Sequence, residues 1–317
     1  MNEEKKDVAK QRCRICGCID GDCRQCVERT GRPCYWVAED LCSACKTTVV
    51  SLASIKGGTG KTHIAILVAR FLAAIGLKVC LIDCDLNNSL SFHFLGDDLL
   101  KTENLNIASA LSDEKNDLND YIIQTSTPNI WIIASTPYLA DLRTLNEKRL
   151  KRKIPGLYGK FDVCIIDCAP TYDNIVLNAV NASDYVITPV LNDLFSYNAA
   201  AFFANVLPRD TDIDNNWFVL INGYDIRFEE SKTGRQHDFI SMYRKSFPLT
   251  PDPTWLPWTN QIHKLVDYHM PLARLKGHAG AVHNSALFNA VSFFAFNLMG
   301  WDYKKDRKLP FNLPEVF

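Results

Sequence analysis

The segment that most constrains the fold of this chain runs from residue 47 to residue 76. It starts with TTVVSLASI, whose β-branched and apolar residues favour a buried strand. The loop KGGTGKT follows at residues 56–62, and the apolar stretch HIAILVARFLAAIG then predicts a helix that ends at Gly76. Glycines let backbone N–H groups close around a phosphate, and the N-terminus of the following helix adds partial positive charge. This order of strand, loop and helix predicts a phosphate-binding loop.

Further apolar runs of strand length follow the loop. They are KVCLID (78–83), NIWIIAS (129–135), FDVCIID (161–167), DYVITPV (184–190) and NWFVLIN (216–222). These runs are apolar on both faces and alternate with helical stretches, which is typical of a parallel sheet covered on both sides. The sequence therefore predicts an α/β fold of the P-loop NTPase type, with a mostly parallel sheet and helices on both faces. We expect this domain to span residues 47–317, preceded by a Cys-rich module at residues 1–46.

Bulk composition limits the possible partners. The formal net charge is −1, so binding to nucleic acid would need a local basic patch. No stretch approaches the roughly 18 to 20 apolar residues of a spanning helix. The N-terminal residues lack the apolar segment of a signal peptide, so a cytoplasmic protein is expected.

The loop itself suggests roles for its residues. Lys61 should reach the β- and γ-phosphates of a bound nucleotide, and the Thr62 hydroxyl should bind Mg²⁺. The rest of the predicted phosphate cradle consists of Gly57, Gly58, Thr59 and Gly60.

The loop KGGTGKT resembles the deviant Walker A loop of the ParA/MinD family of dimeric ATPases, and the resemblance covers about residues 47–300. It implies an enzyme that hydrolyses ATP to ADP and phosphate and forms an ATP-dependent homodimer. In the family the first lysine of the loop, here Lys56, reaches across the dimer to the phosphates of the partner subunit. A cation supplied in this way neutralises charge on the transferred phosphoryl group.

The second predicted strand ends in LIDCDLNNSL, where Asp83 and Asp85 share one strand face because side chains alternate with a period of two. The resemblance implies that Asp85 orients or activates the attacking water and that Asp83 supports the Mg²⁺ site. Lys56, Lys61 and Asp85 thus form the expected catalytic set. The family has Asp-x-Asp-Pro-Gln here, and Leu86 and Asn87 depart from it.

Three other positions follow from the resemblance. Asp167 ends the run FDVCIID at the carboxyl edge of the sheet, where ligands collect, and should hold Mg²⁺ through water. Asn222 and Pro257 occupy the positions that lie near the adenine in the family. His63 replaces the usual hydroxyl residue, and its imidazole could contact the α-phosphate.

Eight of the twelve cysteines lie between Cys13 and Cys45. In a cytosolic chain this density indicates metal, and two C-x2-C pairs can present four thiolates to one tetrahedral Zn²⁺. We therefore group Cys13, Cys16, Cys42 and Cys45 in one site, and a second site could use Cys18, Cys23, Cys26 and Cys34, giving one or two ions. A redox disulfide knot and an iron–sulfur cluster are the alternatives. The remaining cysteines are interpreted as packing residues of the strands: Cys80, Cys84, Cys164 and Cys168.

The resemblance favours a DNA-partition or positioning ATPase. Such a protein binds DNA nonspecifically as an ATP dimer and is released when a ParB-like activator stimulates its slow hydrolysis, so it would be associated with the nucleoid. The candidate DNA-binding residues are Arg227, Arg235, Arg244, Lys245, Lys264, Arg274 and Lys276.

Two alternatives remain at this point. A metal-cluster scaffold or carrier ATPase would use both the ATPase and the Cys-rich module, and visible absorption would distinguish it from a colourless zinc protein. An ATP switch acting on a non-DNA protein cargo would show no ATP-dependent DNA binding. A membrane role is not expected, because Pro310 and Pro314 prevent an amphipathic helix in the tail.

Overall fold

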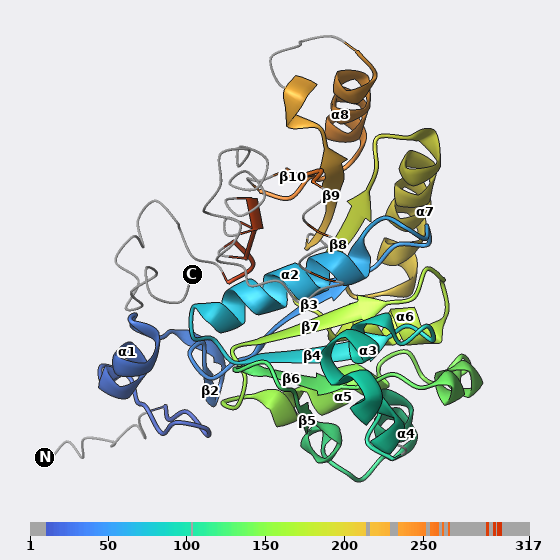
Figure 1. The fold of residues 1–317 in the computed structure, drawn as a ribbon. Coiled ribbons are helices and arrows are strands. Elements are labelled where there is room, and N and C mark those ends of the chain that lie inside the picture. Colours follow the sequence, from blue (N-terminus) through green and yellow to red (C-terminus); the bar gives the residue numbers. More distant parts are fainter. Residues whose placement is uncertain are drawn as a thin grey trace, which may run out of the picture.

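The computed structural model describes residues 11–102, 104–213, 216–228, 234–251, 254–259, 262, 266, 290–291, 294–295 and 297–299. An eight-stranded sheet forms its centre, in the order β10-β9-β8-β3-β7-β4-β6-β5 (Figure 1). All neighbouring strands are parallel except β5, which pairs antiparallel with β6. The strands are β3 (Thr48–Leu52), β4 (Val79–Cys84), β5 (Ile123–Gln124), β6 (Ile130–Ile133), β7 (Val163–Cys168), β8 (Tyr185–Val190), β9 (Trp217–Tyr224) and β10 (Trp255–Pro257).

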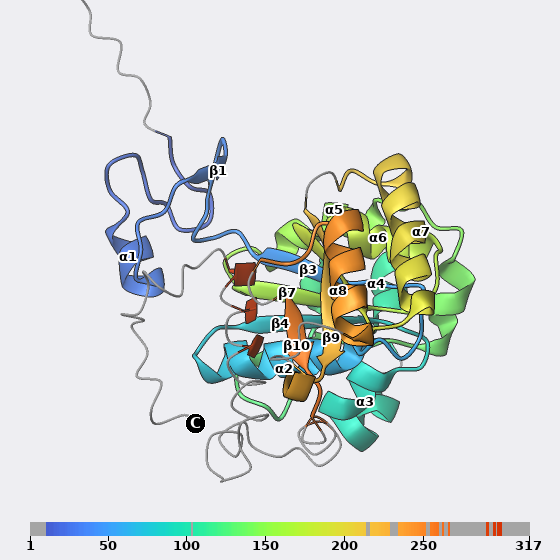
Figure 2. The same cartoon turned by 90° about the horizontal axis from the view of Figure 1, so that it is seen from above.

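Helices cover both faces of this sheet, as Figure 2 shows from above. The α-helices of the domain are α2 (Lys61–Ala74), α3 (Ser89–Leu95), α4 (Ile107–Ser112), α5 (Arg149–Lys153), α6 (Asn174–Ala182), α7 (Leu194–Asp210) and α8 (Arg235–Ser246). Short 3-10 helices connect them: η1 (Gly96–Lys101), η2 (Leu118–Tyr121), η3 (Pro137–Leu142), η4 (Ile154–Leu157) and η5 (Ile226–Phe228). The predicted α/β fold with a mostly parallel sheet is confirmed.

Alternate residues of each strand pack into two separate hydrophobic cores, one on each face of the sheet. Val50 and Leu52 of β3 pack on the side covered by α2, whereas Val49 packs on the side covered by α6 and α7. Both sets are buried, which explains why the strands are apolar on both faces. The four cysteines of β4 and β7 lie in the core on the α6 and α7 side and are at most 2% exposed, as expected for packing residues: Cys80, Cys84, Cys164 and Cys168.

The Cys-rich module contains α1 (Arg24–Thr30) and a hairpin of β1 (Trp36–Ala38) and β2 (Leu41–Cys42). It lies at the edge of the sheet where the parallel strands begin. The N–H of Gly159, just before β7, donates to the carbonyl of Cys45 over 2.8 Å, and Lys46 forms an ion pair with Asp184, just before β8. Thr47 joins the module directly to β3 and donates to the carbonyl of Phe161 over 2.8 Å.

Two strands of the sheet were not predicted. β5 has two residues and β10 has three, and neither is long enough to produce an apolar run. Among the described residues, no helix is long and apolar enough to cross a membrane.

Candidate functional site

The loop between β3 and α2 lies at the carboxyl edge of the sheet. Gly58 and Gly60 have φ values of 73° and 94°, in the left-handed region that favours glycine. A Cβ at Gly60 would lie 2.3 Å from Asn222 Nδ2, so a larger residue there would also have to displace the Asn222 side chain. Asn222 in turn donates to the carbonyl of Thr59 over 2.8 Å. The loop is therefore fixed by its own backbone and by the end of β9.

Lys61 is the first residue of α2 and is only 6% exposed. Its Nζ donates to the carbonyls of Ser54 and Lys56, each over 3.2 Å. Burial lowers the pKa of Lys61. Its ammonium group therefore lies inside the curve of the loop, where phosphate oxygens would replace backbone carbonyls as acceptors.

Lys56 directs its ammonium group away from the loop, toward α7. Its Nζ donates to both carboxylate oxygens of Asp193, over 2.8 and 2.7 Å, and to Ser196 Oγ over 2.9 Å. Asp193 is the N-cap of α7 and also accepts from the Ser196 N–H over 2.8 Å. Burial alone would raise the pKa of Asp193, but these donors hold it below its usual value. The two lysines of one loop thus have separate partners.

Asp83 and Asp167 are directly paired on the adjacent strands β4 and β7. The Thr62 hydroxyl donates to Asp167 Oδ2 over 2.6 Å, while the buried Oδ1 has no hydrogen-bond partner among the described residues. Burial, and then the negative charge of Asp83, raises the pKa of Asp167 to about 8. A hydroxyl beside a buried carboxylate oxygen with no donor fits a hydrated Mg²⁺ ion, which takes oxygen ligands.

Asp83 accepts hydrogen bonds from the segment that follows β4. Its Oδ1 accepts from the N–H of Asp85 over 3.0 Å, and its Oδ2 accepts from the N–H and hydroxyl of Ser91 over 2.8 and 2.7 Å. Burial raises the pKa of Asp83 to about 6. Asp85 is half-buried beyond the end of β4, and its Oδ1 accepts from the Asn87 N–H over 2.9 Å. Asp83 therefore fixes the turn that presents Asp85.

The residues predicted near the adenine lie at the same edge. In the pairing of β9 with β10, Asn222 faces Leu256, and Pro257 follows opposite Tyr224. Pro257 is buried, and the next residue, Trp258, is 50% exposed. His63 is half-buried in the first turn of α2. Their roles toward a nucleotide stay predictions.

Comparison with known proteins places this geometry in a family. A family model described as an AAA domain matches residues 47–215, just over half of the chain. An uncharacterized protein of Methanocaldococcus jannaschii is 34% identical over 225 residues, which cover 68% of this chain and 86% of that protein. The sporulation initiation inhibitor protein Soj of Bacillus subtilis is 28% identical over 205 residues, covering 63% of this chain and 79% of Soj. The chain belongs to the ParA/MinD family of P-loop ATPases.

A solved structure agrees with this assignment at the level of the fold. The crystal structure of a plasmid partition protein from Borrelia burgdorferi has a TM-score of 0.59 and 24% sequence identity. The match covers 80% of this chain and 99% of that protein. The two proteins therefore share the fold of the central parallel sheet and its covering helices.

Sequence reasoning missed Asp193 and Ser196, although they contact the residue that distinguishes the ParA/MinD loop. A signal was present: the run DYVITPV is followed by Leu-Asn-Asp-Leu-Phe-Ser, and aspartate is one of the residues preferred at a helix N-cap. Because β8 lies beside β3 in the sheet, this cap is next to the phosphate loop.

The Cys-rich module precedes the residues matched by the family model. The Sγ atoms of Cys13, Cys16, Cys42 and Cys45 lie within 4.8 Å of one another, and so do those of Cys16, Cys18, Cys26 and Cys42. The second group differs from the predicted set, because Cys23 and Cys34 belong to neither group. All of these cysteines are free thiols in this structure.

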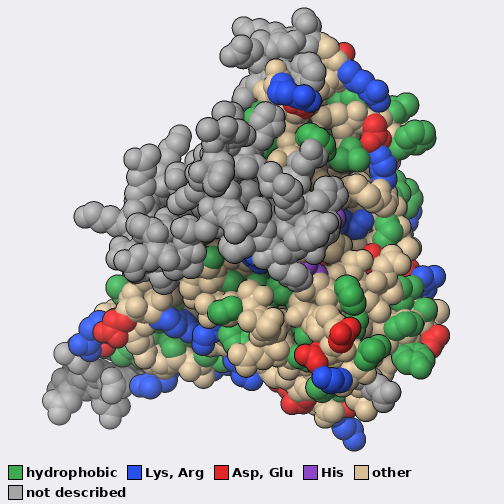
Figure 3. Space-filling view, viewed as in Figure 1, with side chains coloured by type: hydrophobic (Ala, Val, Ile, Leu, Met, Phe, Trp, Pro, Cys, Tyr) green, Lys and Arg blue, Asp and Glu red, His purple; other side chains and the backbone are tan. Residues whose placement is uncertain are grey.

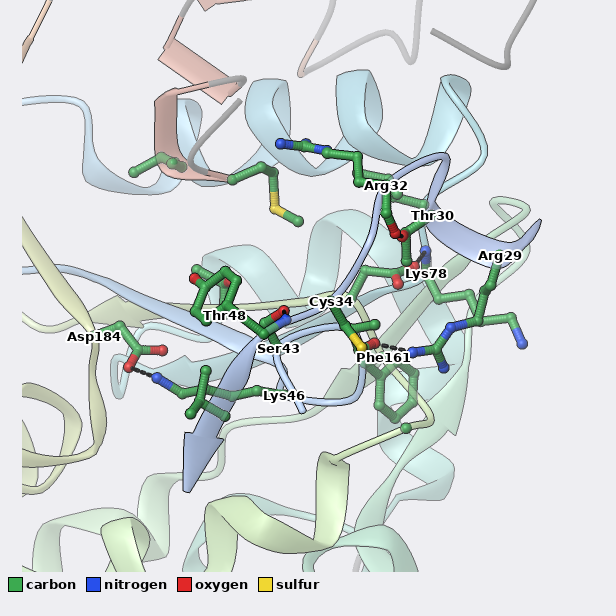
Figure 4. Close-up of a pocket in the computed structure, with 18 of the residues that line it drawn as sticks. Arg29, Thr30, Arg32, Cys34, Ser43, Lys46, Thr48, Lys78, Phe161 and Asp184 are labelled. Atoms are coloured by element: carbon green, nitrogen blue, oxygen red, sulfur yellow. Dashed lines mark hydrogen bonds and ion pairs between the residues drawn. The ribbon is translucent and has the colours of Figure 1, made fainter. Parts of the chain in front are cut away.

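A pocket of about 580 Å³ lies where the module meets the ATPase (Figure 4). Basic side chains of the module and of the strand beginnings line it, among them Arg29, Arg32, Lys46 and Lys78. Asp184 neutralises Lys46 through the ion pair drawn in Figure 4. The phosphate loop and this pocket are at opposite ends of β3.

Proposed function

We propose that this ParA/MinD ATPase is a positioning ATPase of the partition type. It binds ATP with Mg²⁺, forms a homodimer, binds DNA without sequence preference as that dimer, and is released after slow hydrolysis that a ParB-like activator stimulates. The observation that carries the proposal is the direction of Lys56, whose ammonium group leaves its own phosphate loop. The family relationship to Soj and the fold shared with a plasmid partition protein support the same function.

The surface around Lys56 supports dimerisation. Leu194 and Phe195 directly follow Asp193 and are 57% and 78% exposed. Phe92 of α3 and Tyr138 of η3 are also exposed, and their elements follow β4 and β6, which end at the same carboxyl edge as β3. Hydrophobic side chains are visible along this edge of the molecule in Figure 3. Exposed apolar side chains that gather at one edge are typical of an interaction surface.

In the proposed mechanism, Lys61 and the N–H groups of the loop bind the β- and γ-phosphates. Thr62 and Asp167 would hold Mg²⁺, which would neutralise charge on the phosphate oxygens. Asp85 orients the attacking water, and Asp83 keeps Asp85 in place. Lys56 of each subunit leaves Asp193 and contacts the phosphates of the other subunit, so hydrolysis requires the dimer.

DNA binding would use the basic residues around α8. Arg235, Arg244 and Lys245 are exposed on this helix, whereas Arg227 forms an ion pair with Asp225. The other predicted basic residues lie outside the described residues: Lys264, Arg274 and Lys276. Because such contacts go to phosphates, binding should be independent of sequence and should weaken steeply with salt.

For the Cys-rich module, we propose that its thiolates bind Zn²⁺. The module has a very small core around Leu41 and its cysteines, and a module of this size usually needs metal for stability. The ATPase and the module would then be two separately stabilised parts of one chain, joined at Lys46 and Thr47.

The test is binding to random-sequence duplex DNA by gel shift with ATP, with ADP and without nucleotide, at low and moderate salt. We expect salt-sensitive binding with ATP alone. Substituting Arg244 and Lys245 by alanine should weaken it. The control substitutes Lys101 and Lys115, which are exposed and lie between β4 and β5 in the chain, and should leave binding unchanged.

Two results would contradict the proposal. Equal DNA binding with ATP, ADP and no nucleotide would separate DNA binding from the ATP dimer. No DNA binding under any condition, together with normal ATP hydrolysis, would favour a switch that acts on a protein cargo.

A further inference from the structure

The cysteines of the module form one continuous cluster of sulfur atoms. Each of the two groups of four cysteines is compact enough to surround one ion, and the groups share Cys16 and Cys42. The groups therefore contain six different cysteines, namely Cys13, Cys16, Cys18, Cys26, Cys42 and Cys45. Two ions that each take four thiolates from a set of six must share two of them.

The distances between sulfur atoms agree with metal coordination. A tetrahedral ion with metal–sulfur bonds of about 2.3 Å separates its sulfurs by about 3.8 Å. The shared pair, Cys16 and Cys42, has an Sγ–Sγ distance of 3.7 Å. Cys26 belongs to the second group, and its Sγ lies 3.7 Å from Cys16 Sγ and 4.0 Å from Cys42 Sγ.

We propose that residues 13–45 bind two tetrahedral metal ions in one cluster of six thiolates, with the sulfurs of Cys16 and Cys42 bridging both ions. Cys13 and Cys45 are terminal ligands of one ion, and Cys18 and Cys26 are terminal ligands of the other. This inference rests on the proposed metal binding of the module and goes beyond it, because it specifies a dinuclear centre. A purely thiolate, tetrahedral set is typical of Zn²⁺.

The charge balance of the cluster is consistent with its surroundings. Six thiols lose six protons when they bind two divalent ions, which leaves a net charge of −2 on the cluster. The Arg29 guanidinium donates to Cys45 Sγ over 3.5 Å and to the carbonyl of Ala44. The backbone N–H of Cys42 donates to Cys13 Sγ, also over 3.5 Å. Donors around the sulfurs reduce the cost of burying this negative charge.

The remaining two cysteines of the module are placed differently. Cys23 is the N-cap residue of α1 and lies in neither group. Cys34 Sγ lies 3.7 Å from Cys18 Sγ, and Cys34 lines the pocket in Figure 4. A pair of separate ions would need eight thiolates, including these two, and would leave Cys16 and Cys42 bound to one ion each.

The decisive experiment uses the full chain purified with its native metal. We expect two zinc ions per chain by elemental analysis. After exchange for ¹¹³Cd, the NMR spectrum should contain two cadmium signals split by ¹¹³Cd–¹¹³Cd coupling, which arises only when a sulfur atom bridges the ions. This readout needs no variant and therefore does not depend on a substituted module folding correctly.

Variants then identify the bridges. Substituting Cys42 by serine should remove the coupling and reduce the metal content below two, whereas the matched control Cys23→Ser should retain two coupled ions. Two uncoupled cadmium signals, or one ion per chain, would overturn the dinuclear centre while leaving metal binding intact. Retained coupling in Cys42→Ser with loss of coupling in Cys34→Ser would overturn the assignment of Cys42 as a bridge. Absence of metal, or iron in place of zinc, would overturn the zinc proposal itself.

Discussion

Replacing Asp193 by asparagine should strengthen the ATP dimer. In the monomer, the Lys56 ammonium group is held by both oxygens of Asp193 and by Ser196 Oγ. In the proposed dimer, each Lys56 must leave these partners to reach the other subunit. An asparagine removes the negative charge but is as good an N-cap as aspartate, so α7 should keep its hydrogen bond from the Ser196 N–H.

The size of the effect follows from the exposure of the pair. Both side chains are 24% exposed, so the pair belongs at the upper end of the range for surface ion pairs, at about 1 kcal/mol. Two lysines are released in each dimer, so the dissociation free energy should change by about 2 kcal/mol, which is about 30-fold in the dissociation constant.

The assay is analytical ultracentrifugation over a dilution series with a non-hydrolysable ATP analogue. The double variant Asp193→Asn with Lys56→Ala is the control and should behave as Lys56→Ala alone, because the gain depends on the released lysine. A dimer of Asp193→Asn that dissociates as readily as the wild type, or more readily, would refute the idea that Asp193 competes with the partner subunit for Lys56.

The other predictions concern the nucleotide site. Lys61→Ala should abolish ATP binding, measured by calorimetry. Lys56→Ala should bind ATP as a monomer but not dimerise. A normal dimer of Lys56→Ala in light scattering would contradict the role of Lys56 across the interface. Asp85→Ala should bind ATP and remain a stable dimer with near-zero phosphate release, and release at the wild-type rate would exclude Asp85 as the group that orients water. Asp167→Asn should change the pH dependence of stability without nucleotide or Mg²⁺. Burial, and then the charge of Asp83, raises the pKa of this carboxyl from 3.8 to about 8. Between these two pKa values the native state holds a proton that the unfolded chain has lost. The free energy of unfolding therefore falls as the pH rises from the lower pKa to the higher one. The melting temperature of the wild type should therefore drop more between pH 5 and pH 8 than that of Asp167→Asn, and parallel curves would contradict this.

Local patterns were sufficient to predict the six central strands and the phosphate loop. The runs around Val49 and Ile165 are apolar on both faces, and they become the middle strands of a sheet that is covered on both sides. The edge strands β5 and β10 were missed because their pairing is decided by neighbouring strands and not by their own few residues. The carboxylates were placed correctly at the sheet edge because parallel strands end together there.

Contacts between distant segments could not be predicted from local sequence patterns. Lys56 and Asp193 are separated by 137 positions, and only the adjacency of β3 and β8 brings them together. In the module, spacing suggested that each cysteine serves one ion. The folded chain instead places Cys16 and Cys42 at the centre of the cluster, where each lies in both groups. Whether one cysteine belongs to two groups depends on the three-dimensional arrangement, so the spacing of cysteines in the sequence does not predict it.

The Cys-rich module and the phosphate loop lie at opposite ends of β3. In a two-fold dimer joined at the nucleotide edges, the two modules would therefore point outward at the two far ends of the particle. A free subunit offers one such module to a binding partner, and the dimer offers two on a rigid frame. Any partner that repeats along a surface or a polymer would hold the dimer far more tightly than the monomer, through effective concentration alone and without any change in the module itself. ATP would then control the valency of the module from the other end of the sheet.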